Sequence, residues 1–205
     1  MSYNLILENE FRVTGKNIID TFKNNEVFVL GYGSLLYSSG WKTRNMFVPP
    51  KKKDFIECRV NGYERGKFGL YGNLKRLEGV HYYGVIPNKD ASFNGVLVKI
   101  HSELDWVNLM STECITGMAK IPTYRCVDVT ANIAGNILKP GQVVHMVANE
   151  PKNKELSDNF EPALGYYTRV AKGVEKERSL KFKNEFYKTG GVSLKDAVAM
   201  YKTYR

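Results

Sequence analysis

A glycine-containing turn near the start of the chain is a candidate anion-binding site. Residues 27–30 read V-F-V-L, an apolar run typical of a strand buried on both faces, and G-Y-G-S follows at residues 31–34. Two glycines separated by one residue let the backbone turn tightly and leave its N–H groups uncovered. Successive N–H groups in such a turn can hold a carboxylate, a phosphate or an oxyanion. The same pattern also occurs in ordinary turns between a strand and a helix, because G-x-G alone is a weak signal.

Glu113 is a second candidate, as a carboxylate that could take up and return a proton. It lies in the sequence L-M-S-T-E-C-I-T-G-M at residues 109–118. A carboxylate held beside a reacting amine can act first as a general base and then as a general acid. From composition alone, however, Glu113 is typical of a surface carboxylate.

Cys114, directly after Glu113, is an alternative candidate as a nucleophile. A cysteine nucleophile needs a base such as histidine close in space, and the sequence does not indicate one. Free cysteines are more often buried as small hydrophobic residues. Glu113 is therefore the preferred catalytic candidate of the two.

The cysteines and histidines do not form a metal-binding pattern. Cys58, Cys114 and Cys126 are odd in number and irregularly spaced, and neither C-x-x-C nor H-E-x-x-H occurs in the chain. Disulfide frameworks and structural zinc sites both depend on regular spacing. We expect neither a disulfide framework nor a metal site.

Length and composition are those of an ordinary globular protein. The chain has 205 residues, of which 43% are hydrophobic and 25% charged, so a single domain covering residues 1–205 is the simplest expectation. No apolar run approaches the ~18 residues that a membrane helix needs, and the N-terminus lacks a basic-then-apolar signal pattern. We expect a cytoplasmic protein that does not contact a membrane.

The formal net charge of +9 allows two interpretations. An excess of basic residues can indicate an anionic partner, nucleic acid included. Here the lysines and arginines are spread along the chain, apart from Lys51-Lys52-Lys53, and no nucleic-acid-binding motif accompanies them. A solvated basic surface is the favoured interpretation, and nucleic acid is not expected as a partner.

The pattern of apolar residues predicts several short strands and few long helices. A turn is predicted at Asn61-Gly62, and a loop or hairpin over the site at residues 69–79. The residues around Thr43 and Arg44 are predicted to be an exposed connection. Beyond residues 27–30, the predicted strands or extended segments are Asp54–Tyr63, Tyr82–Ile86, Gly95–Ile100, Lys120–Val129 and Val143–Ala148.

Helices are predicted at both ends of the chain and once between strands. Ser102 is suited to cap a short helix that runs to Met110. From Ala163 the apolar residues follow a helical period, with Pro162 suited to the first turn. The other predicted helices are Asn17–Lys23 and a final helix after the capping sequence Ser193-Leu194-Lys195-Asp196. Many strands with few helices between them favour a closed or nearly closed mixed sheet, in the α+β class.

The glycine turn is also the start of a resemblance to a known family. The sequence G-Y-G-S-L at residues 31–35, after an apolar strand, resembles the signature of the γ-glutamylcyclotransferase superfamily, and of its ChaC branch in particular. The strand Gly95–Ile100 and a leucine-containing helical turn precede Glu113, as they precede the family's catalytic glutamate. Val60–Arg65 resembles the family's second strand. Tyr166, four residues after Pro162 and seven before Gly173, resembles the tyrosine that lines the family's substrate pocket.

The resemblance covers residues 27–180 and implies a fold. It implies a mixed β-barrel of short strands with flanking helices. Residues 1–25 would then be an N-terminal decoration and residues 181–205 a C-terminal helical extension. One departure is Met110, which stands where the family usually has an aspartate.

The resemblance also implies an activity that needs no cofactor and no metal. In the family's reaction the α-amino group of a γ-glutamyl compound attacks its own γ-carbonyl, releasing 5-oxoproline and a free amine. Glu113 would be the acid/base catalyst. The substrate-binding residues would be Tyr32, Gly33, Ser34, Leu35 and Tyr166. The partner would be a small γ-glutamyl compound, with glutathione favoured by the G-Y-G-S-L match over other γ-glutamyl amino acids, amines or metabolites.

Two other classes of function remain open. A binding or regulatory protein that keeps the fold without turnover is favoured by Met110 and the net charge, and opposed by Glu113 and the intact glycine turn. A nucleic-acid binder that uses the basic surface would bind any oligonucleotide in a salt-sensitive way, because phosphate contacts release counterions. The oligomeric state is not indicated by the sequence.

Overall fold

The chain folds around a mixed β-sheet. The computed structural model describes residues 15–113 and 124–202, and in these residues the sheet has six strands in the order β2-β3-β1-β5-β4, with β6 paired to β3. Strand β1 runs parallel to β5 and antiparallel to β3, and β6 is parallel to β3. The strands are β1 (Glu26–Gly31), β2 (Phe55–Asn73), β3 (Glu78–Ile100), β4 (Tyr124–Asp128), β5 (Gln142–Asn149) and β6 (Glu161–Pro162).

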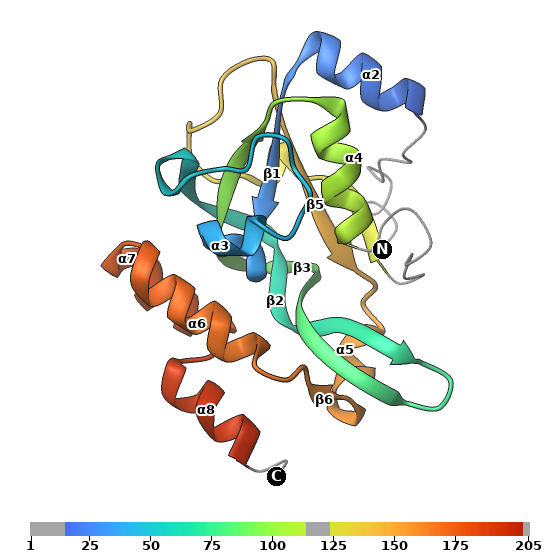
Figure 1. Cartoon of the computed structure of the whole chain (residues 1–205), viewed down its shortest axis with the longest axis vertical. Helices are drawn as coiled ribbons and strands as arrows, with labels where there is room; N and C mark the ends of the chain where they lie inside the picture. The colour runs from blue at the N-terminus through green and yellow to red at the C-terminus, as the bar shows by residue number, and fades with distance from the viewer. Residues whose placement is uncertain (1–14, 114–123, 203–205) are drawn as a thin grey trace.

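Two of these strands are long, which contradicts the prediction of short strands. Strand β2 has 19 residues and β3 has 23, and together they form one bent hairpin (Figure 1). Their pairing shifts register between Asn61 and Tyr63, so Asn61-Gly62 is a bulge rather than the predicted turn. Gly62 has a φ of +81° there, and Pro87 pairs with Tyr63 at the same irregularity. Turn-type residues are tolerated inside a strand at bulges, which explains the wrong prediction.

The sheet curls until its two edges meet. Val60 of β2 forms a bridge with Ile133, which follows β4, and the Ala134 N–H donates to the Arg59 carbonyl at 2.9 Å. One hydrophobic cluster, with Phe28 and Leu30 among its members, is drawn almost entirely from strands and fills the inside of this curved sheet. The predicted nearly closed mixed sheet is confirmed.

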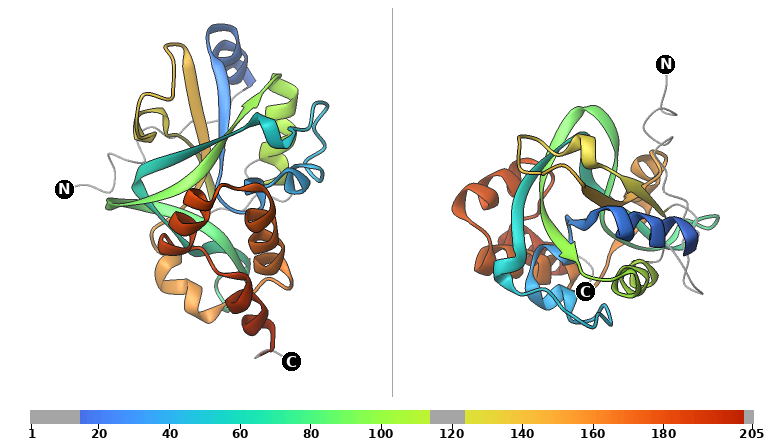
Figure 2. Two further views of the ribbon diagram at one scale, coloured as in Figure 1. Left: turned by 90° about the vertical axis from the view of Figure 1, so that its left-hand side faces the viewer. Right: turned by 90° about the horizontal axis from the view of Figure 1, so that it is seen from above.

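Helices pack on the outside of the strands. The C-terminal helices α6, α7 and α8 lie together against one side, and α2 and α4 lie toward the other end (Figures 1 and 2). A second hydrophobic cluster, which includes Trp41, Trp106 and Tyr167, joins the helices to the sheet. None of the helices in the described residues is long and apolar enough to cross a membrane. The α-helices are α2 (Gly15–Asn24), α3 (Ser38–Trp41), α4 (Glu103–Thr112), α5 (Asn153–Leu156), α6 (Tyr166–Glu177), α7 (Leu180–Lys188) and α8 (Leu194–Lys202).

The predicted helices are confirmed, with two corrections. The Ser102 side chain caps α4, and the Ser193 side chain accepts from the Asp196 N–H at the start of α8. Pro162 is not in the first turn of a helix, because it belongs to β6 and α6 begins after Gly165, whose φ is +68°. The short helices α3 and α5 were not predicted, whereas α7 falls almost wholly within the helical extension expected at residues 181–205. The division into a core at 27–180 and two flanking parts stays a prediction.

Strand β1 separates the two hydrophobic clusters and leads into the site. Val27 and Val29 belong to the cluster between the helices and the sheet, here called the outer cluster. Phe28 and Leu30 belong to the cluster inside the curved sheet, the inner cluster, because successive side chains of a strand point to opposite faces. All four are almost fully buried, as predicted. The glycine turn at the end of β1 is thus attached to the centre of the sheet.

Candidate active site

All six residues predicted for the site line one cavity. The cavity has a volume of about 940 Å³ and lies between the end of β1, the C-terminal end of α4 and helix α6. The six residues are Tyr32, Gly33, Ser34, Leu35, Glu113 and Tyr166.

The glycine turn is held in place by the short helices that follow it. Leu35 and Leu36, in the 3-10 helix Ser34–Leu36, are buried, and the Trp41 indole N–H donates to the Leu35 carbonyl at 2.9 Å. A Cβ atom on Gly40 would lie 1.7 Å from the Ser34 carbonyl oxygen, so α3 packs directly on the turn. The turn is therefore a fixed wall of the cavity rather than a mobile loop lying over it. Leu35, Leu36 and Trp41 all pack into the hydrophobic core.

Tyr166 brings its hydroxyl group to the glycine turn. A Cβ atom on Gly33 would lie 2.4 Å from the Tyr166 hydroxyl oxygen, so this hydroxyl lies directly against the turn. Burial, and then the negative charge of Glu113, raise the pKa of Tyr166 well above its usual value. The pKa of Tyr32 is raised for the same two reasons. Both hydroxyls are neutral hydrogen-bonding groups at physiological pH.

Glu113 lies at the C-terminal end of α4. Its N–H donates to the Leu109 carbonyl at 2.9 Å, which closes the last turn, and its side chain is 20% exposed. Because the C-terminal end of a helix carries a partial negative charge, a carboxylate there is unfavourable without a nearby cation. Trp106, Leu109 and Met110 anchor α4 in the outer cluster. Glu113 therefore enters the cavity from a firmly packed helix.

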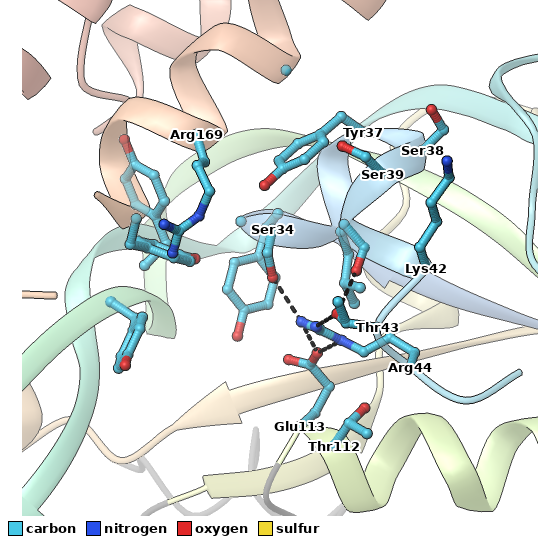
Figure 3. Close-up of a pocket in the computed structure, with 18 of the residues that line it drawn as sticks. Ser34, Tyr37, Ser38, Ser39, Lys42, Thr43, Arg44, Thr112, Glu113 and Arg169 are labelled. Atoms are coloured by element: carbon cyan, nitrogen blue, oxygen red, sulfur yellow. Dashed lines mark hydrogen bonds and ion pairs between the residues drawn. The ribbon is translucent and has the colours of Figure 1, made fainter. Parts of the chain in front are cut away.

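Arg44 is the cation that accompanies Glu113. Its Nε donates to Glu113 Oε1 at 2.7 Å, and its Nη2 lies 2.6 Å from the same oxygen. Nη2 also donates to the Ser34 hydroxyl at 2.8 Å, and Nη1 donates to the Thr43 hydroxyl at 2.7 Å. Figure 3 shows the guanidinium between Ser34 and Glu113, with the other carboxylate oxygen turned away from it. Arg44 thus links the glycine turn to the candidate acid.

Helix α4 also holds the segment that carries Arg44. The Phe47 N–H donates to Asp105 Oδ1 at 2.6 Å, and the Asn108 side chain donates to the Asn45 carbonyl at 3.0 Å. The same helix therefore positions both members of the Arg44–Glu113 pair. The prediction that Thr43 and Arg44 form an exposed connection is wrong for Arg44, whose side chain is only 16% exposed.

Helix α6 approaches the turn closely because of Gly173. A Cβ atom at this position would lie 2.3 Å from the Tyr37 ring, so only glycine allows the helix to pack here. The residues of α6 that line the cavity include Tyr166 and, on its exposed face, Arg169, Lys172 and Lys176. Tyr166 and Gly173 therefore have related roles: Gly173 lets α6 pack against Tyr37, and Tyr166 places its hydroxyl against the glycine turn.

The hairpin predicted over the site is also present. Strands β2 and β3 are joined by a turn between Asn73 and Glu78, and Tyr71 and Tyr82 from its two arms line the cavity. The Tyr82 ring packs edge-on against the Tyr166 ring, with centroids 4.9 Å apart. Aromatic side chains of the hairpin and of α6 thus form part of the cavity wall.

The cysteines and histidines within the described residues lie elsewhere. Cys58 and Cys126 are free thiols buried in the core, and Cys114 is outside the described residues. Residues 15–113 and 124–202 contain no group of three His, Cys, Asp or Glu side chains arranged to hold a metal ion.

Comparison with known proteins shows the fold. No protein-family model and no curated protein matches the chain. A solved structure described as a gamma-glutamyl cyclotransferase aligns with a TM-score of 0.54 and 16% identity, over 85% of this chain and 98% of that one. An uncharacterized protein from Homo sapiens aligns with a TM-score of 0.51 and 15% identity, over 85% of this chain and 97% of that one. The chain therefore has the γ-glutamylcyclotransferase-like fold, as the sequence resemblance implied.

Proposed function

We propose that this chain, which has the γ-glutamylcyclotransferase-like fold, is a cyclotransferase that converts a γ-glutamyl compound into 5-oxoproline and a free amine. One observation carries the proposal: the Glu113 carboxylate and the glycine turn line the same cavity and are joined through Arg44. In one cavity, a carboxylate can transfer the proton, and backbone N–H groups can stabilise the oxyanion that develops on the carbonyl oxygen.

The reaction is an intramolecular exchange of one C–N bond for another. The substrate's α-amine forms a bond to its γ-carbonyl carbon, and the bond from that carbon to the leaving amine breaks. The nucleophile is tethered to its target in the substrate itself, so the protein has to hold the chain folded with the amine and the carbonyl aligned for attack. No redox step or group donor is needed for atoms and charges to balance.

Glu113 would transfer the proton that this exchange requires. The α-amine is a cation at neutral pH and must lose a proton before it attacks, and the leaving amine must gain one. A single carboxylate beside both nitrogens can do both, for a contribution on the order of 10²–10⁴-fold. The Arg44 contact is confined to Oε1 in the hydrogen bonds described, and Oε2 is the oxygen turned away from Arg44 in Figure 3.

The glycine turn would stabilise the negative charge that develops on the carbonyl oxygen. Backbone N–H groups around Tyr32, Gly33, Ser34 and Leu35 are fixed before substrate arrives, so they need no reorganisation in the transition state. Tyr166 would add a neutral hydroxyl beside them, because its raised pKa keeps the proton on the oxygen. The same groups could instead hold the substrate's α-carboxylate.

The test is release of 5-oxoproline by the purified protein from a panel of γ-glutamyl compounds, with glutathione as the first member. Wild-type protein is compared with Glu113→Gln, which keeps the shape but cannot take up a proton. Glu103→Gln is the matched control, because Glu103 is an exposed residue in the first turn of the same helix. We expect release by wild type and Glu103→Gln and loss of release in Glu113→Gln.

Other outcomes would change the proposal in defined ways. Release that survives in Glu113→Gln would keep the reaction and discard Glu113 as the catalyst. No release from any member of the panel would overturn the enzymatic function and favour a binding protein with this fold. Release that is lost in Cys114→Ala would revive the cysteine nucleophile.

A further inference from the structure

One side of the cavity carries a row of cations that the proposed reaction does not use. Lys42, Arg169, Lys172 and Lys176 line the cavity and are exposed; together they are called the basic rim. Three of them lie on α6 at spacings of three and four residues, which places them on one face of the helix. At 1.5 Å per residue this row is about 10 Å long.

The carboxylates of the cavity do not neutralise the basic rim. Glu113 is paired with Arg44. Glu177 accepts from the Ser38 N–H and the Ser38 hydroxyl, both at 2.8 Å, and lies 3.5 Å from Arg178. Among the described residues, no ion pair involves any member of the basic rim.

A purely structural role does not account for this arrangement. Like charges three or four residues apart on a helix are destabilising by roughly 0.2–0.5 kcal/mol per pair. The carboxylate of Glu175, on the same helix, forms an ion pair with Lys183 of α7 at 3.4 Å, and not with a member of the basic rim. Unpaired cations that repel one another along the side of a helix that faces a cavity are expected where the cavity binds an anion.

The cavity also exceeds what a γ-glutamyl group needs. Its volume of about 940 Å³ is near the upper end of the range of about 300–1,000 Å³ for sites that hold drug-sized ligands. In Figure 3 Glu113 lies below Ser34, whereas Arg169 lies above it on the left and Lys42 above it on the right. A substrate folded against Glu113 would therefore extend its amine component toward the basic rim.

We propose that the basic rim binds the amine component of the substrate and that this component carries two or more negative charges. The inference rests on the proposed function, because it assigns the substrate class of the same cavity. A lone carboxylate would need one cation, whereas a row about 10 Å long matches anionic groups spaced along an extended chain. Successive carboxylates fit this description best, and a phosphate shares the chemistry.

The kinetic test uses γ-glutamyl compounds that differ in the charge of the leaving amine. The neutral member is γ-glutamyl-glycinamide. γ-Glutamyl-glutamate has a dicarboxylate leaving amine, and its γ-linked extension by one more glutamate has a tricarboxylate one. The phosphate member is the γ-glutamyl amide of phosphoethanolamine. We expect kcat/KM to be about tenfold or more higher for the anionic members, because fields of this kind raise encounter rates. The advantage should shrink with added salt, because attraction between exposed charges is largely screened beyond the Debye length, about 8 Å at 0.15 M ionic strength.

A double variant, Lys172→Met with Lys176→Met, should abolish the preference. The matched control is Lys181→Met with Lys188→Met, which removes the same charge from exposed positions on α7 away from the cavity. Equal kcat/KM for neutral and anionic members, or an equal effect of the two double variants, would overturn the inference while leaving the proposed function intact.

A binding measurement separates this inference from the proposed function. Glutaryl-glutamate lacks the α-amine and cannot cyclise, so calorimetry can follow its binding without turnover. Binding that weakens in the Lys172→Met, Lys176→Met variant but not in the α7 control would support the basic rim even if no γ-glutamyl compound were cleaved. Oligonucleotide binding that depends on the same two lysines, without any binding of glutaryl-glutamate, would overturn the inference in favour of a nucleic-acid surface.

Discussion

The guanidinium of Arg44 binds one oxygen of Glu113 through two nitrogens, at 2.7 Å from Nε and 2.6 Å from Nη2. The same guanidinium reaches the Ser34 hydroxyl at 2.8 Å. The two groups that the proposed reaction needs, a carboxylate and a glycine turn, are therefore fixed relative to each other by a side chain that would not itself react. Arg44 is a positioning residue.

Replacing Arg44 tests this role. Arg44→Met should lower kcat for 5-oxoproline release by about 10²-fold, because a displacement of about 1 Å in a catalytic group costs that much. KM should change less, since Arg44 is engaged with Glu113 and Ser34. Steady-state kinetics on the best panel substrate measures both.

The matched control for Arg44→Met is Lys99→Met. Lys99 and Glu26 form an ion pair of similar length, 2.6 Å, but it is exposed and distant from the cavity lining. Exposed pairs contribute about 0–1 kcal/mol to stability, so Lys99→Met should leave both kinetic constants unchanged. Wild-type kcat in Arg44→Met would show that Glu113 needs no such partner.

Gly33 and Tyr166 should behave as a coupled pair. Gly33→Ala places a methyl group 2.4 Å from the Tyr166 hydroxyl oxygen, so we expect a loss of about 1–3 kcal/mol in the free energy of unfolding. Tyr166→Phe removes that oxygen, and the next atoms near the added methyl are at 3.3 and 3.7 Å. The double variant should therefore be more stable than Gly33→Ala alone. Urea unfolding of the four proteins gives the coupling energy, and simple additivity would contradict the contact.

Stability should fall between neutral and acidic pH because of His81. Burial lowers the pKa of this imidazole from 6.5 to about 4, and its Nδ1 lies 2.7 Å from the Tyr167 hydroxyl. The unfolded chain takes up a proton below about pH 6.5, whereas the native protein does so only near pH 4. The free energy of unfolding should therefore drop by about 3 kcal/mol as the pH falls through this window.

The variant His81→Gln isolates this contribution. Its free energy of unfolding should be lower at neutral pH but should depend less on pH between 6.5 and 4. His101→Gln is the control, because His101 is exposed. Some slope should persist in His81→Gln, since burial also lowers the pKa of His145. An unchanged slope in His81→Gln would refute the assignment to His81.

The buried thiols should be unreactive in the native protein. Burial raises the pKa of Cys58 to about 12 and that of Cys126 further, so neither forms a thiolate near neutral pH. A thiol reagent at pH 8 should modify neither residue until the protein is unfolded, as peptide mapping by mass spectrometry can show. Rapid modification of either in the folded protein would contradict its buried placement.

Much of the fold follows from local sequence. The run V-F-V-L, the Ser102 cap and the helical period after Ala163 predict β1, α4 and α6, because burial on a strand or helix imposes a short repeat that can be read directly. Together with the G-Y-G-S-L turn and Glu113, these elements also indicated the fold that the structural comparison shows. The lengths of β2 and β3 were predicted wrongly. The Asn-Gly pair at residues 61–62 is typical of both a turn and a bulge, and only the pairing with the neighbouring strand distinguishes the two.

The chemistry of the cavity depended on tertiary structure. Arg44 is 69 residues from Glu113, and only the packing of α4 against the segment after α3 brings the two together. The basic residues of α6 face the cavity because Gly173 lets the helix approach Tyr37. A single sequence gives the identity of these side chains but not the residues that they contact in the folded chain. Whether a charge is paired, solvated or aimed into a cavity is decided by residues distant in the chain, and it therefore became visible only once the chain was folded.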